Sequence, residues 1–314
     1  MAGYSDRVFR ALCAQQGADA CYTEMVSAVG LSRSSHKSAE LLLPYSEEER
    51  LHPQIFASTE DDASAGMQQL LSLCSPQLVD LNCGCPVPKV IKKGCGAALM
   101  DDPAQIERIV RAMSSYGVPV TIKIRTGNSS VNFLECAAAA VDGGACAVAI
   151  HGRSATQGYS GTADHRPAAK LVRTLPVPVI ISGDMFSPEA VVRALNETGA
   201  HGVMLARGAV GRPWIFRHLK DYEQGAREFR VPVHEVCAQM RRHLRGSVQA
   251  FGEDRAVKEF RKMCAGYTRG LPGATALRRE MFRFADMASV ELVISEYESS
   301  LDRNESVLLY EERD

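Results

Sequence analysis

Residues 118–125 read VPVTIKIR and residues 145–152 read ACAVAIHG, two apolar runs separated by an Ala-rich segment. Their nearly continuous Val, Ile and Ala content is typical of parallel strands that are buried on both faces. The same alternation of a short apolar run and a longer amphipathic or Ala-rich segment fills the first two thirds of the chain. The other runs are 18–26, 53–58, 78–84, 177–184 and 201–208. This alternation predicts an α/β fold with a parallel sheet.

Helices are expected between these runs, for example over 61–74, 103–117 and 187–199. Proline near a helix start and glycine at a helix end support the last two. Seven strand–helix units are visible, whereas a (β/α)8 barrel needs eight. A helix over about 6–16 has no strand before it. Periodicity therefore leaves open an open sheet or a barrel that lacks its first strand.

Beyond about residue 221 the strand pattern disappears. The helical segments expected there are 233–251, 253–269, 274–287 and 289–299. We therefore expect one domain over 1–220 and a small, all-helical domain over 221–314. Residues 202–283 carry 17 Lys and Arg against 8 Asp and Glu, a balance of +9, whereas 284–314 carry 2 against 9. The basic block is either a phosphate-binding surface or a solvated helical face.

Composition narrows the class of protein. The chain has 314 residues, 36 Lys and Arg against 37 Asp and Glu, and 46% apolar residues. These values are typical of globular proteins and exclude disordered and collagen-like chains. No segment approaches the ~20 apolar residues of a membrane helix, and the first residues lack the apolar core of a secretory signal. Ten cysteines without such a signal fit a reducing compartment, so we expect a cytoplasmic protein.

Each apolar run ends in polar or ionisable side chains. In parallel-strand folds, functional groups gather at the carboxyl ends of the strands. The uniformity of this pattern favours an active site over a purely structural protein. The residues concerned are Glu24, Gln54, Asn82, Cys83, Cys85, Lys123, Arg125, His151, Arg153, Asp184 and Arg207.

The position of Lys123 within TIKIR requires an anionic partner, because an unpaired ammonium is costly among apolar neighbours. That partner is either a buried carboxylate, such as Glu24 or Asp80, or the electron-rich end of a reduced flavin. The glycines of SGD (182–184) and ARGAVGR (206–212) would let backbone N–H groups approach a phosphate. Both features are compatible with a phosphorylated cofactor.

Cys85 follows a strand on a loop framed by glycine and proline. Its thiol is either a proton donor or a small buried apolar group. Cys83, Cys85 and Cys95 have a spacing that matches no standard zinc or iron–sulfur pattern. No metal is therefore expected.

Several motifs together resemble the tRNA-dihydrouridine synthase family, and its bacterial branch in particular. The match covers nearly the whole chain, and FRKMCAGYTRGLPGATALR (260–278) is similar to the C-terminal segment of that branch. The remaining motifs are MAGYSD (1–6), TEMV (23–26), QIFAS (54–58), LNCGCP (81–86), GAALM (96–100), TIKIRTG (121–127), IHGRSATQGYSG (150–161), SGD (182–184) and ARGAVGRPWIF (206–216).

The resemblance implies an FMN-binding TIM barrel followed by a helical tRNA-binding domain. It implies reduction of the C5=C6 bond of a uridine in the tRNA D-loop, with NADPH as reductant and Cys85 as the acid that protonates C5. The positions that match FMN-binding residues are Met1, Ala2, Gln54, Lys123, His151, Ser182, Gly183, Asp184, Ala206 and Arg207. Those that match positions near the uridine or the RNA backbone are Asn82, Lys89, Arg125 and Arg153.

Two departures from the family pattern stand out. The family begins with a strand before the Met-Ala-Gly motif, whereas this chain starts at that Met. We therefore expect a barrel whose first strand is largely missing, from a truncated or mis-assigned start. Ser182 also stands where the family usually has Asn.

Two other functions remain open. One is a flavin-dependent reductase of a small pyrimidine, similar to dihydroorotate dehydrogenases, although such an enzyme would not need a basic helical domain. The other is a catalytically inactive RNA-binding homologue. The partners expected are tRNA and the cofactors, with no membrane, no metal and no obligate protein partner.

Overall fold

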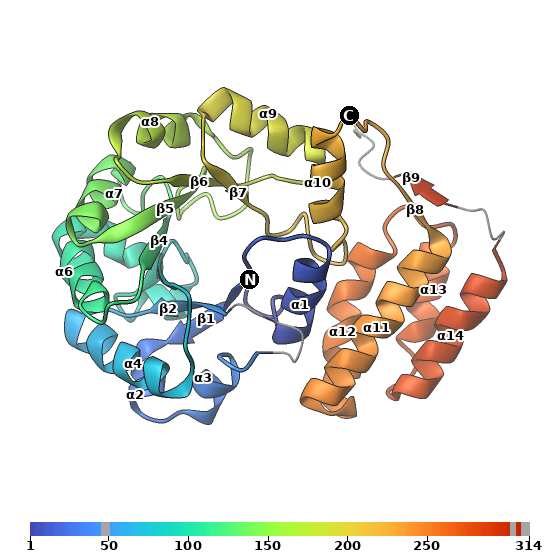
Figure 1. The fold of residues 1–314 in the computed structure, drawn as a ribbon. Helices are drawn as coiled ribbons and strands as arrows, with labels where there is room; N and C mark the ends of the chain where they lie inside the picture. The colour runs from blue at the N-terminus through green and yellow to red at the C-terminus, as the bar shows by residue number, and fades with distance from the viewer. Residues whose placement is uncertain (45–50, 302–305, 309–314) are drawn as a thin grey trace. The chain divides into compact units, whose positions relative to one another are not determined.

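A computed structural model describes residues 1–44, 51–301 and 306–308. Its main feature is a parallel seven-stranded sheet in which the strands follow one another in sequence order from β1 to β7. Figure 1 shows this sheet curled, with helices along its outer face. The arrangement is that of a (β/α) barrel. Its strands are β1 (Tyr22–Ser27), β2 (His52–Phe56), β3 (Val79–Cys83), β4 (Val120–Ile124), β5 (Ala145–His151), β6 (Val179–Ser182) and β7 (Gly202–Met204).

The chain divides into two compact units. The first comprises residues 1–2, 20–185 and 189–207, and therefore contains the sheet. The second comprises residues 3–19, 186–188 and 208–314. The helices of the first unit, with most of α9, are α2 (Ala28–Ser32), α3 (His36–Glu40), α4 (Glu60–Leu73), α5 (Pro88–Ile91), the 3-10 helix η1 (Gly96–Asp101), α6 (Pro103–Ser114), α7 (Phe133–Asp142), α8 (Arg166–Thr174) and α9 (Pro188–Thr198).

The apolar runs become strands because both of their faces are covered. Leu81, Ile122 and Val148 are completely buried, and the two-residue period of a strand places their neighbours on the opposite face. The helices bury one stripe each. In α6, Ile106, Ile109, Val110 and Met113 are buried, at the spacing of a single helical face. The sequence-predicted strands and helices of this unit are confirmed.

The second unit is mainly helical, and it takes in residues 3–19, 186–188 and 208–220 as well as the range 221–314 expected for the helical domain. It contains α1 (Arg7–Gln15), α10 (Ile215–Glu223), α11 (Val233–Phe251), α12 (Glu253–Tyr267), α13 (Ala274–Met281) and α14 (Met287–Ser299). The helix α1, which has no strand before it, packs on α11, where the ring of Phe9 stacks on that of His243 with centroids 5.7 Å apart. One feature was not predicted: β8 (Arg230–Pro232) pairs antiparallel with β9 (Ser306–Leu308).

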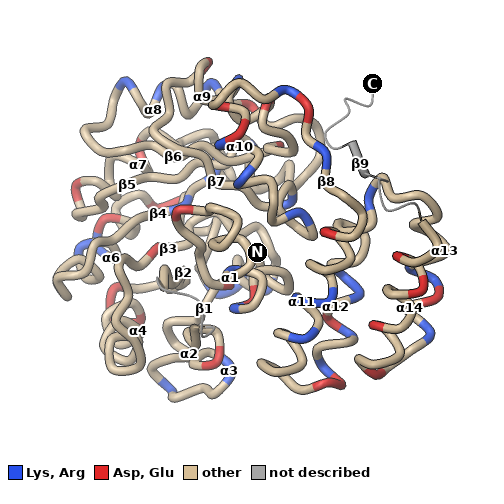
Figure 2. Tube along the Cα trace, turned by 45° about the vertical axis from the view of Figure 1, so that its right-hand side comes forward, with Lys and Arg blue, Asp and Glu red and all other residues tan. Residues whose placement is uncertain are grey.

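The basic residues of the second unit are partly neutralised within it. Figure 2 shows Lys and Arg along α11 and α12 with acidic residues among them. Arg241 pairs with Glu298 at 2.6 Å and Arg245 with Glu291 at 2.5 Å. The acidic α14 therefore supplies counter-charges to α11, and only part of the +9 balance of 202–283 is left for a ligand. No helix in the described ranges is long and apolar enough to cross a membrane.

A close approach between α4 and α2 leads to the first prediction. A Cβ at Gly66 would lie 2.6 Å from the Cβ and 2.8 Å from the Cα of Ala28. Valine gains about 1 kcal/mol or less of helix propensity over glycine, whereas overpacking of a core costs about 1–3 kcal/mol. We therefore expect Gly66→Val to lower the free energy of unfolding by about 2 kcal/mol, measured by urea denaturation. The control is Ala65→Val at the exposed neighbouring position; equal losses in both variants would contradict the prediction.

Candidate functional site

The strand register places several polar residues of β2, β3 and β4 on the inner face of the curled sheet. Gln54 on β2 pairs with Asp80 on β3, which pairs with Thr121 on β4. Two residues further along, Asn82 pairs with Lys123. Paired residues of parallel strands point to the same face, and so do residues two apart. The register therefore brings side chains from three strands into one cluster.

A continuous chain of hydrogen bonds links this cluster. Thr121 Oγ1 donates to Asp80 Oδ1 at 2.6 Å, and Gln54 Nε2 donates to Asp80 Oδ2 at 2.8 Å. Asn82 Nδ2 donates to Gln54 Oε1 at 2.9 Å. The oxygen of the Asn82 side chain, Oδ1, accepts from the backbone N–H of Cys85 at 2.9 Å and from that of Gly84 at 3.2 Å. The Cys85 loop is thereby tied to the centre of the sheet.

The cluster contains two ionisable groups with shifted pKa values. Burial raises the pKa of Asp80 to about 6, although its hydrogen bonds with Thr121 and Gln54 and the charge of Lys123 oppose the shift. Burial and the positive charge of Arg125 lower the pKa of Lys123 to about 8, and the charges of Asp80 and Cys85 oppose this. Asp80, one of the two carboxylates considered from the sequence as partners of Lys123, stabilises the charged form of that ammonium.

His151 lies at the end of β5 and is held in its neutral form. Burial, followed by the positive charges of Lys123, Arg125 and Arg153, lowers its pKa to about 3. Its Nδ1 atom is buried and has no hydrogen-bond partner within the described part of the chain. Gly183 has φ of +122°, and a Cβ there would lie 3.0 Å from His151 Nδ1. A side chain at position 183 would therefore clash with the imidazole and with Ala163.

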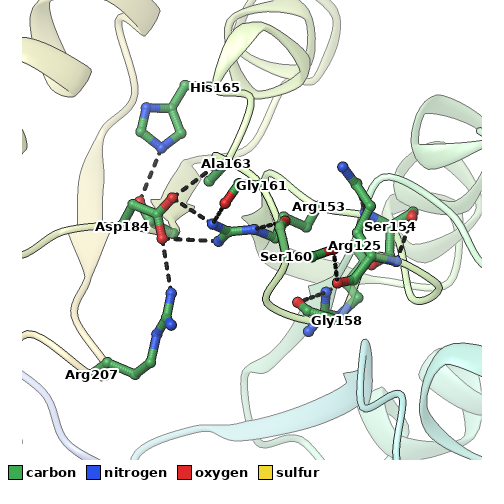
Figure 3. A network of polar contacts seen from close by, with 12 residues as sticks. Arg125, Arg153, Ser154, Gly158, Ser160, Gly161, Ala163, His165, Asp184 and Arg207 are labelled. Carbon is green, nitrogen blue, oxygen red and sulfur yellow. Dashed lines mark hydrogen bonds and ion pairs between the residues drawn. The ribbon is translucent and has the colours of Figure 1, made fainter.

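Asp184 joins two arginines at the ends of β5, β6 and β7 (Figure 3). Arg153 donates to both of its carboxylate oxygens, at 2.9 and 2.7 Å, and Arg207 donates to Oδ1 at 2.9 Å. The backbone N–H of Ala163 donates to Oδ2 at 2.8 Å. Burial acts to raise the pKa of Asp184, but these hydrogen bonds and the two arginine charges outweigh it, so the pKa lies below its usual value. The carboxylate therefore stays charged and holds Arg207 in place.

Arg125 and Arg153 have their guanidinium groups inside the protein. Arg125 donates to the carbonyl oxygen of Gly84 at 2.8 Å and to those of Ser154 and Gly158 at 2.9 and 3.1 Å. Arg153 is 2% exposed and also donates to the carbonyl oxygens of residues 160 and 161. As Figure 3 shows, both arginines hold the loop over 153–161. Arg125 also ties that loop to the Cys85 loop.

The Cys85 thiol is partly exposed, whereas Cys83 points to the other face of β3 and is fully buried. Gly96 supports the Cys85 loop: its φ is +63°, and a Cβ there would lie 2.7 Å from the carbonyl oxygen of Cys85. The backbone N–H of Ala97 donates to the same oxygen at 3.0 Å. Within the described ranges, no three His, Cys, Asp or Glu side chains gather as metal ligands would.

The remaining predicted residues lie around this cluster. Ser182 is buried and pairs with His151 across β5 and β6. Lys89 is exposed on α5, and Ala206 is partly buried. Met1 and Ala2 belong to the same compact unit as the sheet.

Sequence reasoning missed Thr121 and Tyr159 and considered Asp80 only as a candidate partner of Lys123. Thr121 and Asp80 lie in the middle of apolar runs, and a polar side chain at such a position is the signal that could have found them. Tyr159 is 60% exposed, and the guanidinium carbon of Arg207 lies 4.6 Å from the centre of its ring. Its place in the motif IHGRSATQGYSG gave no indication that the ring would be exposed beside an arginine.

Comparisons with known proteins agree with this architecture. The sequence profile of the dihydrouridine synthase family matches residues 1–303. The chain is 35% identical over 305 residues to a probable tRNA-dihydrouridine synthase of Treponema pallidum, covering 92% of this chain and 90% of the relative. It is 34% identical over 290 residues to tRNA-dihydrouridine synthase B of Pseudomonas aeruginosa, covering 91% and 87%.

Among solved structures, histamine dehydrogenase from Rhizobium sp. 4-9 superposes with a TM-score of 0.53 at 10% identity, over 82% of this chain and 46% of that one. At this identity the likeness concerns the fold alone. The sequence relatives and the family profile extend over most of both chains. On this evidence the chain belongs to the dihydrouridine synthase family, a family of oxidoreductases.

Proposed function

We propose that this protein reduces the C5=C6 bond of a uridine in the D-loop of tRNA, with FMN as cofactor and NADPH as reductant. One observation carries the proposal. The partly exposed thiol of Cys85 stands on a loop anchored by Asn82, which pairs with Lys123 across β3 and β4. A proton donor beside a fixed cation is suited to protonating a carbon whose neighbouring carbonyl gains negative charge.

The residues present fit a flavin. His151 offers an unpartnered buried nitrogen, and Gly183, with φ of +122°, brings backbone without a side chain close to it. When bound, FMN reduced by NADPH supplies the hydride for C6 of the uracil ring. The residues that would hold the ring of FMN are Met1, Ala2, Gln54, Lys123 and His151. Those that would hold its ribityl phosphate are Ser182, Gly183, Asp184, Ala206 and Arg207.

The chain's own residues perform the other half of the addition. Cys85 donates its proton to C5 of the uracil ring. With a pKa of about 8, Lys123 stays mostly protonated at neutral pH and stabilises the negative charge that develops nearby. His151 stays neutral, so it can donate or accept a hydrogen bond without adding charge. Asn82 lies next to the target uridine and keeps the Cys85 loop in position.

The RNA contacts divide into direct and indirect ones. Lys89 is exposed and contacts the RNA backbone. Arg125 and Arg153 act indirectly, by shaping the loop over 153–161, because their guanidinium groups are bound within the protein. The helical unit binds the folded tRNA through phosphate contacts. A tRNA substrate is consistent with a cytoplasmic location.

The role of Cys85 is tested by Cys85→Ala. We expect dihydrouridine formation to fall by about 10²–10⁴-fold, the usual contribution of a general acid, while the visible flavin absorbance of the purified protein is retained. Dihydrouridine is measured by mass spectrometry in tRNA from a strain that lacks the endogenous gene. The matched control is Cys146→Ser, because Cys146 is exposed on β5 and outside the cluster. Full activity of Cys85→Ala would refute the proposed mechanism.

The neutral state of His151 makes a prediction about stability. Its pKa is lowered from 6.5 to about 3 in the folded protein, so between these values the unfolded chain binds a proton that the folded chain does not. The stabilisation is therefore complete above 6.5 and is lost as the pH falls toward 3. We expect the free energy of unfolding of His151→Gln to fall less steeply than that of the wild type over this range. Asp80, whose pKa is raised to about 6, also titrates in this range, but it does so in both proteins and its contribution therefore cancels in the comparison. The free energy of unfolding is measured by urea denaturation at a series of pH values. An equal dependence on pH in the two proteins would contradict the lowered pKa of His151.

Binding of tRNA by the helical unit is tested through its salt dependence. Lys258, Arg269 and Arg279 are exposed on or beside α12 and α13. Replacing all three by alanine should weaken tRNA binding and reduce the slope of log K against log salt by up to roughly 2–3. The control replaces Lys170, Arg173 and Arg193, which are exposed on α8 and α9. The assignment fails if the two triple variants lose tRNA affinity equally.

A further inference from the structure

Asp80 is a buried carboxylate that the proposed reaction does not use. It has no exposed surface and lies in the middle of β3, between Gln54 on β2 and Thr121 on β4. A charged group in such a place is costly unless it is fully hydrogen-bonded. Its two oxygens accept from Thr121 Oγ1 and Gln54 Nε2, at 2.6 and 2.8 Å. Asp80 therefore has a defined set of partners, and one of them belongs to the proposed site.

A chain of hydrogen bonds links Asp80 to Cys85 through Gln54 and Asn82, and its donors and acceptors can be arranged in only one order. The backbone N–H groups of Gly84 and Cys85 only donate, so they select the oxygen of the Asn82 amide. The nitrogen of that amide must then donate to the oxygen of Gln54. The nitrogen of Gln54 is left pointing at position 80, where only an acceptor satisfies it.

A carboxylate at position 80 meets this demand because an ionised carboxylate accepts and does not donate. Thr121 donates to its other oxygen, so both neighbours of Asp80 present hydrogens to it. Each amide along the chain thus has one orientation that satisfies all of its partners, and a flipped Gln54 or Asn82 would place two donors or two acceptors against each other. Buried polar chains of this kind are rigid when they are complete.

We propose that Asp80 is a positioning residue: it sets the orientation of the Gln54 and Asn82 side-chain amides and, through them, immobilises the backbone that carries Cys85. The importance of this position for catalysis rests on the proposed function, whereas the positioning itself does not. Asp80 acts on the site in two ways that can be separated, as a hydrogen-bond acceptor for Gln54 and as a counter-charge for Lys123.

Two substitutions distinguish the acceptor from the charge. Asp80→Asn removes the charge but keeps an acceptor for Gln54, because its own nitrogen can face Thr121, whose hydroxyl can accept as well as donate. Asp80→Leu has a similar shape and removes both the charge and the acceptor. Thr121→Val is the matched control, since it removes one donor to the same buried carboxylate and leaves the bond from Gln54 intact.

The measurement is amide hydrogen exchange at Gly84 and Cys85, followed by NMR on the protein without RNA. We expect Asp80→Leu to speed exchange at these amides about tenfold, as the loss of one buried hydrogen bond implies. Asp80→Asn and Thr121→Val should stay within about twofold of the wild type. Unchanged exchange in Asp80→Leu overturns the proposal. Equal acceleration in Asp80→Asn and Asp80→Leu also overturns it, because the charge alone would then be responsible.

A second variant tests the proposal independently, in case Asp80→Leu does not fold. Gln54→Met interrupts the same chain one step nearer to Cys85 and leaves the carboxylate in place. It should speed exchange at Gly84 and Cys85 to a similar extent, and wild-type exchange in a folded Gln54→Met protein would count against the proposal. Because exchange needs no tRNA, the result is independent of activity. Faster exchange in Asp80→Leu together with full activity of Cys85→Ala would retain the positioning role and reject the proposed function.

Discussion

Polar side chains on the inner face of a parallel sheet must find partners within the protein, because helices cover the outer face and water has little access to the centre. This constraint organises the site. Asp80 lies completely buried between two strands, and its carboxylate is satisfied by Thr121 and Gln54. The same bonds fix the Gln54 amide, which fixes Asn82, which holds the Cys85 loop. The need to satisfy a buried carboxylate thereby fixes the geometry of the Cys85 loop at the carboxyl end of β3.

A second set of buried charges shapes the other side of the site. Arg153 and Asp184 form a bidentate pair, and Arg153 also holds the carbonyl oxygens of a long loop. Arginine suits this task because its planar group offers several donors in a fixed arrangement. Arg207 is partly exposed and forms an ion pair with the same carboxylate. Arg153 is thus bound entirely within the protein, whereas 40% of the Arg207 side chain is exposed.

Much of the fold followed from the pattern of apolar residues. Continuous Val, Ile and Leu runs mark strands that are buried on both faces. Three of the four C-terminal helices begin and end within two residues of the predicted positions, whereas α13 ends at Met281, six residues before its predicted end. The pair β8 and β9 was missed because each has only three residues, too few for a period to be visible. The polar residues at the strand ends were recognised because a polar side chain that ends an apolar run is easily seen in the sequence.

The sequence by itself determined the order of strands and helices, the family and the set of polar residues at the strand ends, because these depend on local periodicity and on residue types at fixed spacings. The tertiary structure alone decided what each polar side chain contacts. Arg125 and Arg153, expected near the RNA, point into the protein, and α1 packs with the C-terminal helices. Such partners come from strands far apart in the sequence, and only the register of the sheet and the path of the loops bring them together.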